Sequence, residues 1–159
     1  MGTIVQYITS EDRNILLKIA EPALPLESYL NKNKSEIISF GTFVKSWNPL
    51  YFLLKKTSNL EVFEILADNF SHETYDEYKK IISSQDVKTL HQYLNKMSLS
   101  KIQELLDDMK LCEVISKQPG YNMDYIYDQE SILVEFKALK EAAQSAYSLN
   151  AGLVQILYP

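Results

Sequence analysis

The sequence predicts an all-α domain of stacked antiparallel helical pairs, and the alternative is a compact helical bundle. Three observations lead to this fold class. The 159 residues include only 4 Gly and 5 Pro, which favours long elements over a turn-rich β fold. Apolar residues make up 46% of the chain and recur at helical spacing. A short passage also recurs loosely, at a period of roughly 34 to 40 residues. We expect a single helical domain over residues 1–159.

The recurring passage is the basis for predicting stacked pairs. Its copies begin with Asn14-Ile-Leu-Leu-Lys-Ile-Ala, Asn48-Pro-Leu-Tyr-Phe-Leu-Leu and Thr89-Leu-His-Gln-Tyr-Leu. A second leucine-containing segment follows each copy, starting at Leu26, Leu60 and Leu99. One helical pair of this size cannot bury its own apolar face, so neighbouring pairs bury each other.

Capping residues place the elements of the first part of the chain. Ser10-Glu-Asp is typical of a helix N-cap with acidic residues in the first turn, and Pro22 ends that helix. Pro25 suits the first turn of the next helix. Ser35 is expected to cap a short segment that Gly41 ends. A strand pattern is possible only over residues 3–8.

The middle of the chain has clearer helix starts. Asn48-Pro49 combines a favoured cap residue with Pro at the first helical position. Ser71, Ser84 and either Ser98 or Ser100 are expected to cap three more helices. Residues at helical spacing follow the first of these caps: Tyr75, Tyr78, Ile81 and Ile82.

The loop at 117–128 is a possible internal boundary, because Pro119-Gly120 interrupts the helical pattern. A long helix is expected after it, over residues 129–149. Asn150-Ala-Gly152 is a helix-stop signal. The apolar tail at 153–159 must then be buried, and it is a candidate start of another repeat.

Two copies of the passage resemble ankyrin repeats. Asn48-Pro-Leu-Tyr51 followed by Asn59-Leu-Glu-Val-Phe-Glu-Ile-Leu66 is similar to that family's Thr-Pro-Leu-His opening and its Leu-Glu-Val-Val outer helix. Thr89-Leu-His91 followed by Ile102-Gln-Glu-Leu-Leu106 is the second copy. The glycines that normally close the inner helices are missing. The resemblance covers residues 12–110 and implies a protein-binding array.

Charge and cysteine content exclude several function classes. The net charge of −5 and the single arginine, Arg13, argue against nucleic acid and phosphate as partners. Cys112 is the only cysteine, so no internal disulfide is possible. No stretch has the roughly 20 apolar residues that a membrane span needs, and no signal peptide is evident. We expect a cytoplasmic protein, either in its own cell or in a host cell.

The sequence contains no catalytic, cofactor-binding or metal-binding motif that we recognise. The two histidines, His72 and His91, do not lie in a zinc-binding pattern, and no phosphate-binding glycine loop occurs. We therefore predict no cofactor and no metal, and we predict that the chain is not an enzyme.

A non-enzymatic protein–protein interaction module on helical repeats is the favoured function. The alternative is a regulatory or accessory helical-bundle domain of a larger protein or of a secreted effector. Aromatic side chains cover much interface area at little entropic cost. The predicted partner-binding residues are accordingly Trp47, Tyr51, Tyr93, Tyr121, Tyr125 and Tyr127.

Overall fold

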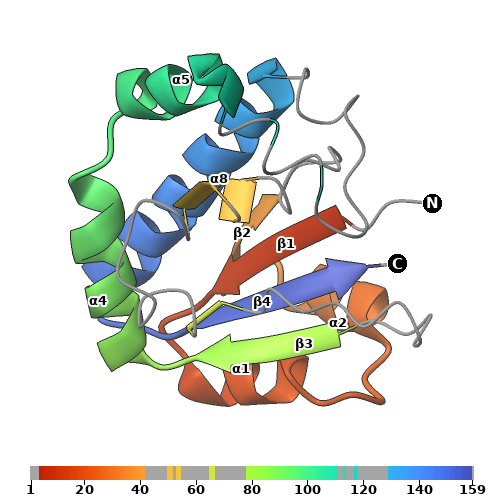
Figure 1. The fold of residues 1–159 in the computed structure, drawn as a ribbon. Coiled ribbons are helices and arrows are strands. Elements are labelled where there is room, and N and C mark those ends of the chain that lie inside the picture. The colour runs from red at the N-terminus through yellow and green to blue at the C-terminus, as the bar shows by residue number, and fades with distance from the viewer. Residues whose placement is uncertain are drawn as a thin grey trace.

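The protein is a mixed α/β structure. The computed structural model describes residues 4–41, 50–51, 53–54, 65–66, 78–110, 113, 117 and 129–158. A four-stranded antiparallel sheet lies between two layers of helices (Figure 1). The predicted all-α class, in both its stacked-pair and its bundle form, is therefore wrong.

The sheet joins strands from both ends of the chain. The elements, in chain order, are β1 (Ile4–Thr9), α1 (Arg13–Ile19), α2 (Leu26–Lys32), β2 (Ile38–Gly41), β3 (Tyr78–Ile82), α4 (Ser84–Asn95), α5 (Leu99–Asp107), α8 (Gln129–Ser148) and β4 (Leu153–Tyr158). The strand order is β2-β1-β4-β3. Ile4 pairs with Tyr158, so the two termini leave the sheet side by side (Figure 1).

The two central strands, β1 and β4, are covered by helices on both faces. Five of the six residues of β4 are buried, which confirms that the apolar tail is buried. This tail completes the sheet and does not start another repeat. The strand expected near residues 3–8 is also confirmed, as β1. Strands buried on both faces read as nearly continuous apolar runs, and so their sequences lack a clear alternation.

The two edge strands, β2 and β3, replace elements that we expected to be helical or irregular. Ile38–Gly41 pairs with β1, and Tyr78–Ile82 pairs with β4. Residues 78–82 have apolar spacing that also fits a helix, and the pairing with β4 decides their conformation. Lys79 and Lys80 are typical of an edge strand, where lysines discourage pairing with other molecules.

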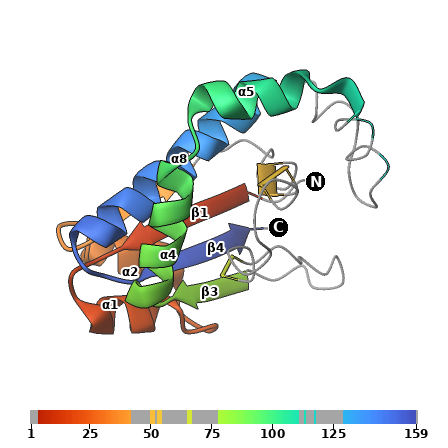
Figure 2. The same ribbon diagram turned by 60° about the vertical axis from the view of Figure 1, so that its left-hand side comes forward.

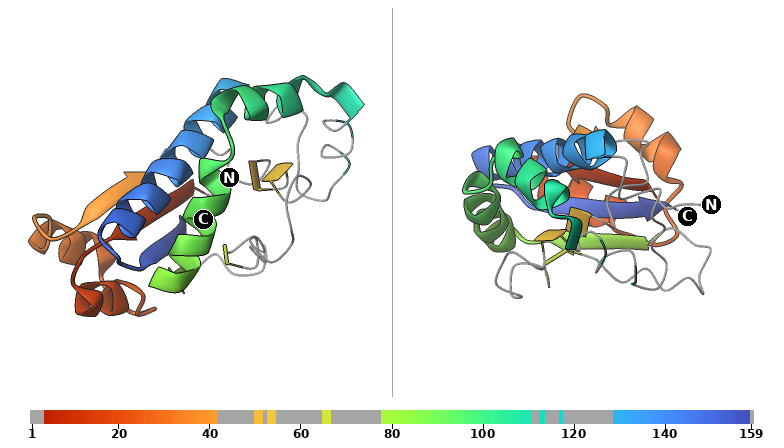
Figure 3. Two further views of the ribbon diagram at one scale, coloured as in Figure 1. Left: turned by 90° about the vertical axis from the view of Figure 1, so that its left-hand side faces the viewer. Right: turned by 45° about the horizontal axis from the view of Figure 1, so that its top comes forward.

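The helices form one layer on each face of the sheet. α4 and α8 lie side by side on one face, and α5 packs on the N-terminal part of α8 (Figure 2). α1 and α2 cover the other face (Figure 3). The main core, on the α8 face, includes Tyr7, Leu90 and Phe136. The second core lies under α1 and α2, and its buried members are Ile8, Ile15, Leu16, Ile19, Leu26, Val154 and Ile156.

This layering shows why the three copies of the recurring passage do not form one continuous stack. The first copy of the passage forms α1 and α2, whereas the third copy forms α4 and α5. These two pairs belong to cores on opposite faces of the sheet, so they cannot stack on each other as repeats do. In the second copy, the described residues 50–51 and 53–54 are helical. Leu50 and Leu54 of this copy lie in the main core together with the third copy, so the sheet separates the first copy from the other two.

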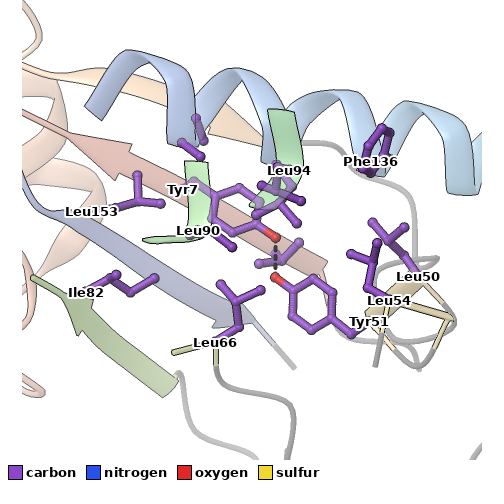
Figure 4. Close-up of a cluster of buried hydrophobic side chains, with 14 of the residues drawn as sticks. Tyr7, Leu50, Tyr51, Leu54, Leu66, Ile82, Leu90, Leu94, Phe136 and Leu153 are labelled. Atoms are coloured by element: carbon purple, nitrogen blue, oxygen red, sulfur yellow. Dashed lines mark hydrogen bonds between the residues drawn. The ribbon is translucent and has the colours of Figure 1, made fainter. Parts of the chain in front are cut away.

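Leucines of the second and third copies lie mostly in the main core. Leu50, Leu66 and Leu90 are buried, and Leu105 is half-buried against this core. Figure 4 shows the first three around Tyr7 and Tyr51.

Several helix ends fall close to the predicted ones. Ser83 and Ser98 cap α4 and α5 by accepting hydrogen bonds from Asp86 N and Lys101 N. Asp12 rather than Ser10 caps α1. The expected helix over 129–149 is confirmed as α8, and Asn150 ends it with a φ of 50°. The boundary predicted at 117–128 lies outside the described residues, apart from Lys117.

Candidate functional site

A cleft of about 460 Å³ lies at one end of the sheet, and we call it the sheet-end cleft. Residues from four places form it: the β1–α1 turn and α1, the end of β3, the start of α4, and the α8–β4 turn. Its floor includes the buried side chains of Leu16 and Ile82. Its size is in the usual range of small binding pockets.

Gly152 brings the α8–β4 turn close to the end of β3. A Cβ atom at this position would lie 2.8 Å from the carbonyl oxygen of Ile82, which is too close for any side chain. The hydroxyl of Thr9 donates a hydrogen bond of 2.8 Å to the carbonyl oxygen of Gly152. Glycine is therefore required for the backbone to close this wall of the cleft.

The rim of the sheet-end cleft is apolar on two sides. Leu17 on α1 is 46% exposed, and Ile81 on β3 is 42% exposed. Charged residues complete the rim: Glu11, Arg13 and Asp86. The cleft thus combines exposed aliphatic surface with charges of both signs.

The hydroxyl groups that face the cleft mainly stabilise the local backbone. Ser10 donates to the carbonyl oxygen of Glu36 at 2.6 Å and accepts from the backbone N–H of Asp12. Ser83 accepts from the backbone N–H of Asp86 at 3.1 Å. These bonds fix the starts of α1 and α4, and so they fix the shape of the cleft.

A second unusual feature lies inside the main core, and we call it the interior polar cluster: Tyr7, Tyr51, Gln155 and Glu135. Tyr7 and Gln155 are register partners on β1 and β4. The hydroxyls of Tyr7 and Tyr51 share a hydrogen bond, and both side chains are surrounded by apolar residues (Figure 4). The amide of Gln155 donates to the Tyr51 hydroxyl at 2.8 Å.

Both phenols of the interior polar cluster stay neutral in the folded protein. Burial raises the pKa of Tyr7 well above its ordinary value, and a charge on Tyr51 or Glu135 would raise it further. Burial also raises the pKa of Tyr51, although its hydrogen bonds to Tyr7 and Gln155 oppose the shift.

Glu135 is the acidic member of the interior polar cluster. It lies on α8 and is 1% exposed. Burial raises the pKa of its carboxyl from 4.5 to about 8. The sequence gives little sign of this position, because Glu135 stands in a helix whose other acidic residues are mostly exposed.

The structure places only two of the predicted partner-binding residues. Tyr51 is buried, with its hydroxyl in the interior polar cluster. Tyr93 on α4 is half-buried against the main core. The other four lie outside the described residues: Trp47, Tyr121, Tyr125 and Tyr127. Their part in partner binding stays a prediction.

The described residues contain neither a metal-binding cluster nor a membrane-spanning helix. Within the described ranges, no group of three or more His, Cys, Asp or Glu side chains could hold a metal ion. No helix in the described part of the chain is long and apolar enough to cross a membrane. His91, one of the two histidines, stacks on Tyr147 with a ring-centroid distance of 4.3 Å.

Comparison with known proteins identifies the fold but no family. No family model matches the chain, and no curated protein matches its sequence. The fold is similar to the crystal structure of YfbM from Escherichia coli, a protein of unknown function. The two chains are 13% identical, with a TM-score of 0.56, over 96% of this chain and 99% of YfbM. This likeness shows the fold alone, and it replaces the ankyrin resemblance.

Two pairs of adjacent apolar residues in the sequence mark the border of the sheet-end cleft. Leu17 and Ile81 are exposed, whereas their apolar neighbours Leu16 and Ile82 are buried. Successive side chains of a strand point to opposite faces, so the exposure of Ile81 could be predicted only if residues 78–82 were known to be a strand.

Proposed function

We propose that the chain is a protein-interaction domain whose sheet-end cleft receives an apolar side chain of a partner protein. One observation carries the proposal: Leu17 and Ile81 are exposed aliphatic residues from two different elements, and both border the same cleft. A side chain bound between them would remove aliphatic surface from water on both sides.

The energetics favour such an anchor. Burial of apolar surface contributes about 25 cal/mol per Å², and a few deeply seated anchors dominate the affinity of most interfaces. The polar residues around the cleft resemble the solvated rim that surrounds an apolar interface centre. The floor of Leu16 and Ile82 is part of the packed structure, so little reorganisation is needed on binding.

The charges suggest what lies beside the anchor. Glu11 and Asp86 outnumber Arg13 on the rim, and the whole chain has a net charge of −5. Complementary charge speeds association and discriminates between partners. We therefore expect an aliphatic or aromatic side chain next to a basic residue of the partner.

Photo-crosslinking in the cells that produce the protein tests this proposal. A photoreactive amino acid would replace Leu17 or Ile81 in turn. Val134 on α8 is a matched control, since it is 44% exposed and lies on the helical layer of the opposite face. We expect both cleft positions to capture the same polypeptide and the control position not to capture it.

Partner affinity and the free energy of unfolding of two variants complete the test. Ile81→Ser should weaken binding of the purified partner at least tenfold, whereas Val134→Ser should leave it unchanged. Neither change should alter the free energy of unfolding by more than about 0.5 kcal/mol, because both side chains are exposed. Equal capture at all three positions, or no capture at the cleft, would contradict the proposal. A small molecule that protects only the cleft positions would point to a ligand site instead.

A further inference from the structure

Glu135 is an acidic side chain enclosed in the main core. It precedes Phe136 on α8, and both side chains are buried. Neither carboxyl oxygen of Glu135 has a hydrogen-bond partner among the described residues. Buried polar groups are nearly always hydrogen-bonded, so this carboxyl needs an explanation.

An ionised carboxylate is far more costly in such a place than a neutral carboxylic acid. The interior does not replace the water that solvates the charge, and a buried charge without a partner usually takes up or releases a proton instead. Glu135 is therefore held as the neutral acid.

In the described part of the chain, the strands that face α8 bring no group that would stabilise a negative charge on Glu135. Tyr7 on β1 and Tyr51 both sense the charge of Glu135, and both are buried neutral phenols. β2 has no titratable side chain. The only titratable residue of β4 is Tyr158, and it packs in the second core, on the other face of the sheet.

The helices that pack against α8 keep their charges at the surface. Lys140 of α8 itself donates to the carbonyl oxygen of Met97. On α4, Tyr93 is half-buried against the main core and His91 stacks on Tyr147. The charged residues of α4 and α5 are exposed: Asp86, Lys88, Lys101, Glu104 and Asp107. The other charged residues of α8 are exposed as well: Glu130, Lys137 and Glu141.

We propose that Glu135 is a proton switch for the packing of α8. When its carboxyl is protonated, α8 packs stably on β1 and on the Tyr7–Tyr51 pair. When the proton is lost, an unpaired charge lies in the main core, and the contact between α8 and the sheet is weakened.

The pKa of Glu135 sets the pH range over which the switch affects stability. In the unfolded chain the carboxyl has its ordinary pKa of 4.5, and in the folded protein burial raises the pKa to about 8. Between these two values the folded state binds one more proton than the unfolded state. The contribution to stability is therefore complete below pH 4.5 and is lost as the pH rises toward 8.

Denaturation of the full chain at a series of pH values tests the switch. The unfolding equilibrium constant would be measured for the wild type, Glu135→Gln and Glu135→Met, with Glu130→Gln as the control. Glu130 is an exposed glutamate on the same helix. Relative to Glu135→Gln, the constant of the wild type should rise about tenfold per pH unit between pH 5.5 and pH 7.5. The control variant should follow the wild type.

Hydrogen exchange provides a local readout. After correction for the intrinsic chemical rate, amides of α8 should exchange faster as the pH rises toward 9 in the wild type, and this acceleration should be absent from Glu135→Gln. Parallel pH profiles for the wild type and the variants at position 135 would overturn the proposal. So would failure of both variants to fold, because a neutral acid should be replaceable by a neutral amide or an apolar side chain of similar size.

Discussion

The two faces of the sheet bury their residues in different ways. Beneath α1 and α2, the strands contribute the aliphatic side chains Ile8, Val154 and Ile156. Beneath α4 and α8, the adjacent positions on the same strands contribute Tyr7 and Gln155, with Glu135 above them on α8. Neighbouring residues of one strand thus face two different cores, one aliphatic and one with a polar centre.

The second core contributes stability that does not depend directly on pH, whereas the contribution of the main core depends on the protonation of a buried carboxyl. An aliphatic core needs only volume and shape, so pH does not affect it directly. A buried polar group needs a partner, and its free energy depends on its protonation state. The α8 face therefore has most of the large core residues and also the group that can destabilise it.

The largest expected effect compares truncations on the two faces. Phe136→Ala should lower the free energy of unfolding by about 3–5 kcal/mol, because Phe136 is fully buried in the main core. Leu26→Ala, at the border of the second core, should cost about 2 kcal/mol. Urea denaturation measures both values. Equal losses would show that the main core does not dominate stability.

A smaller effect isolates the hydrogen bonds of the interior polar cluster. Tyr51→Phe leaves the Tyr7 hydroxyl and the Gln155 amide without this partner, and it should cost about 1–3 kcal/mol. Tyr147→Phe is the matched control, because Tyr147 is 43% exposed. Equal changes in the melting temperature of the two variants would show that the hydrogen bonds of the interior polar cluster do not stabilise the main core.

The smallest effect should not depend on the face at all. Ser83→Ala removes the N-cap of α4, and Asp12→Ala removes the N-cap of α1. Both caps lie at the ends of helices and outside the two cores, so each change should cost about 1 kcal/mol. A clear difference between these costs would mean that the helix ends are coupled to their cores.

Local signals predicted several of the helix ends. Serines located the starts of α4 and α5 within a few residues, and Pro22 and Asn150 marked the ends of α1 and α8, because capping depends on neighbouring backbone groups. The sheet could not be predicted in the same way. β4 lacks an alternating pattern because helices cover both of its faces, and residues 78–82 fit helical spacing as well as strand pairing.

The candidate sites depend on contacts between distant parts of the chain. The sheet-end cleft forms where residues 10–17, 81–86 and 150–152 meet, and no single segment indicates it. Glu135 stands in a helix whose exposed face is rich in Glu and Lys, so only the packing shows that it is buried. The first and third copies of the recurring passage mark real helices, but the sequence does not show that the sheet lies between them.

Carbon NMR of the side-chain carboxyl groups tests most directly whether the polar face contains a neutral acid. Glutamate labelled with ¹³C at the carboxyl would be followed as the pH is raised from 3 to 9. One resonance should titrate near pH 8, and it should be missing from the spectrum of Glu135→Gln. If every glutamate resonance titrates below about pH 6, Glu135 is ionised in the folded protein at neutral pH and the main core does not contain a neutral acid.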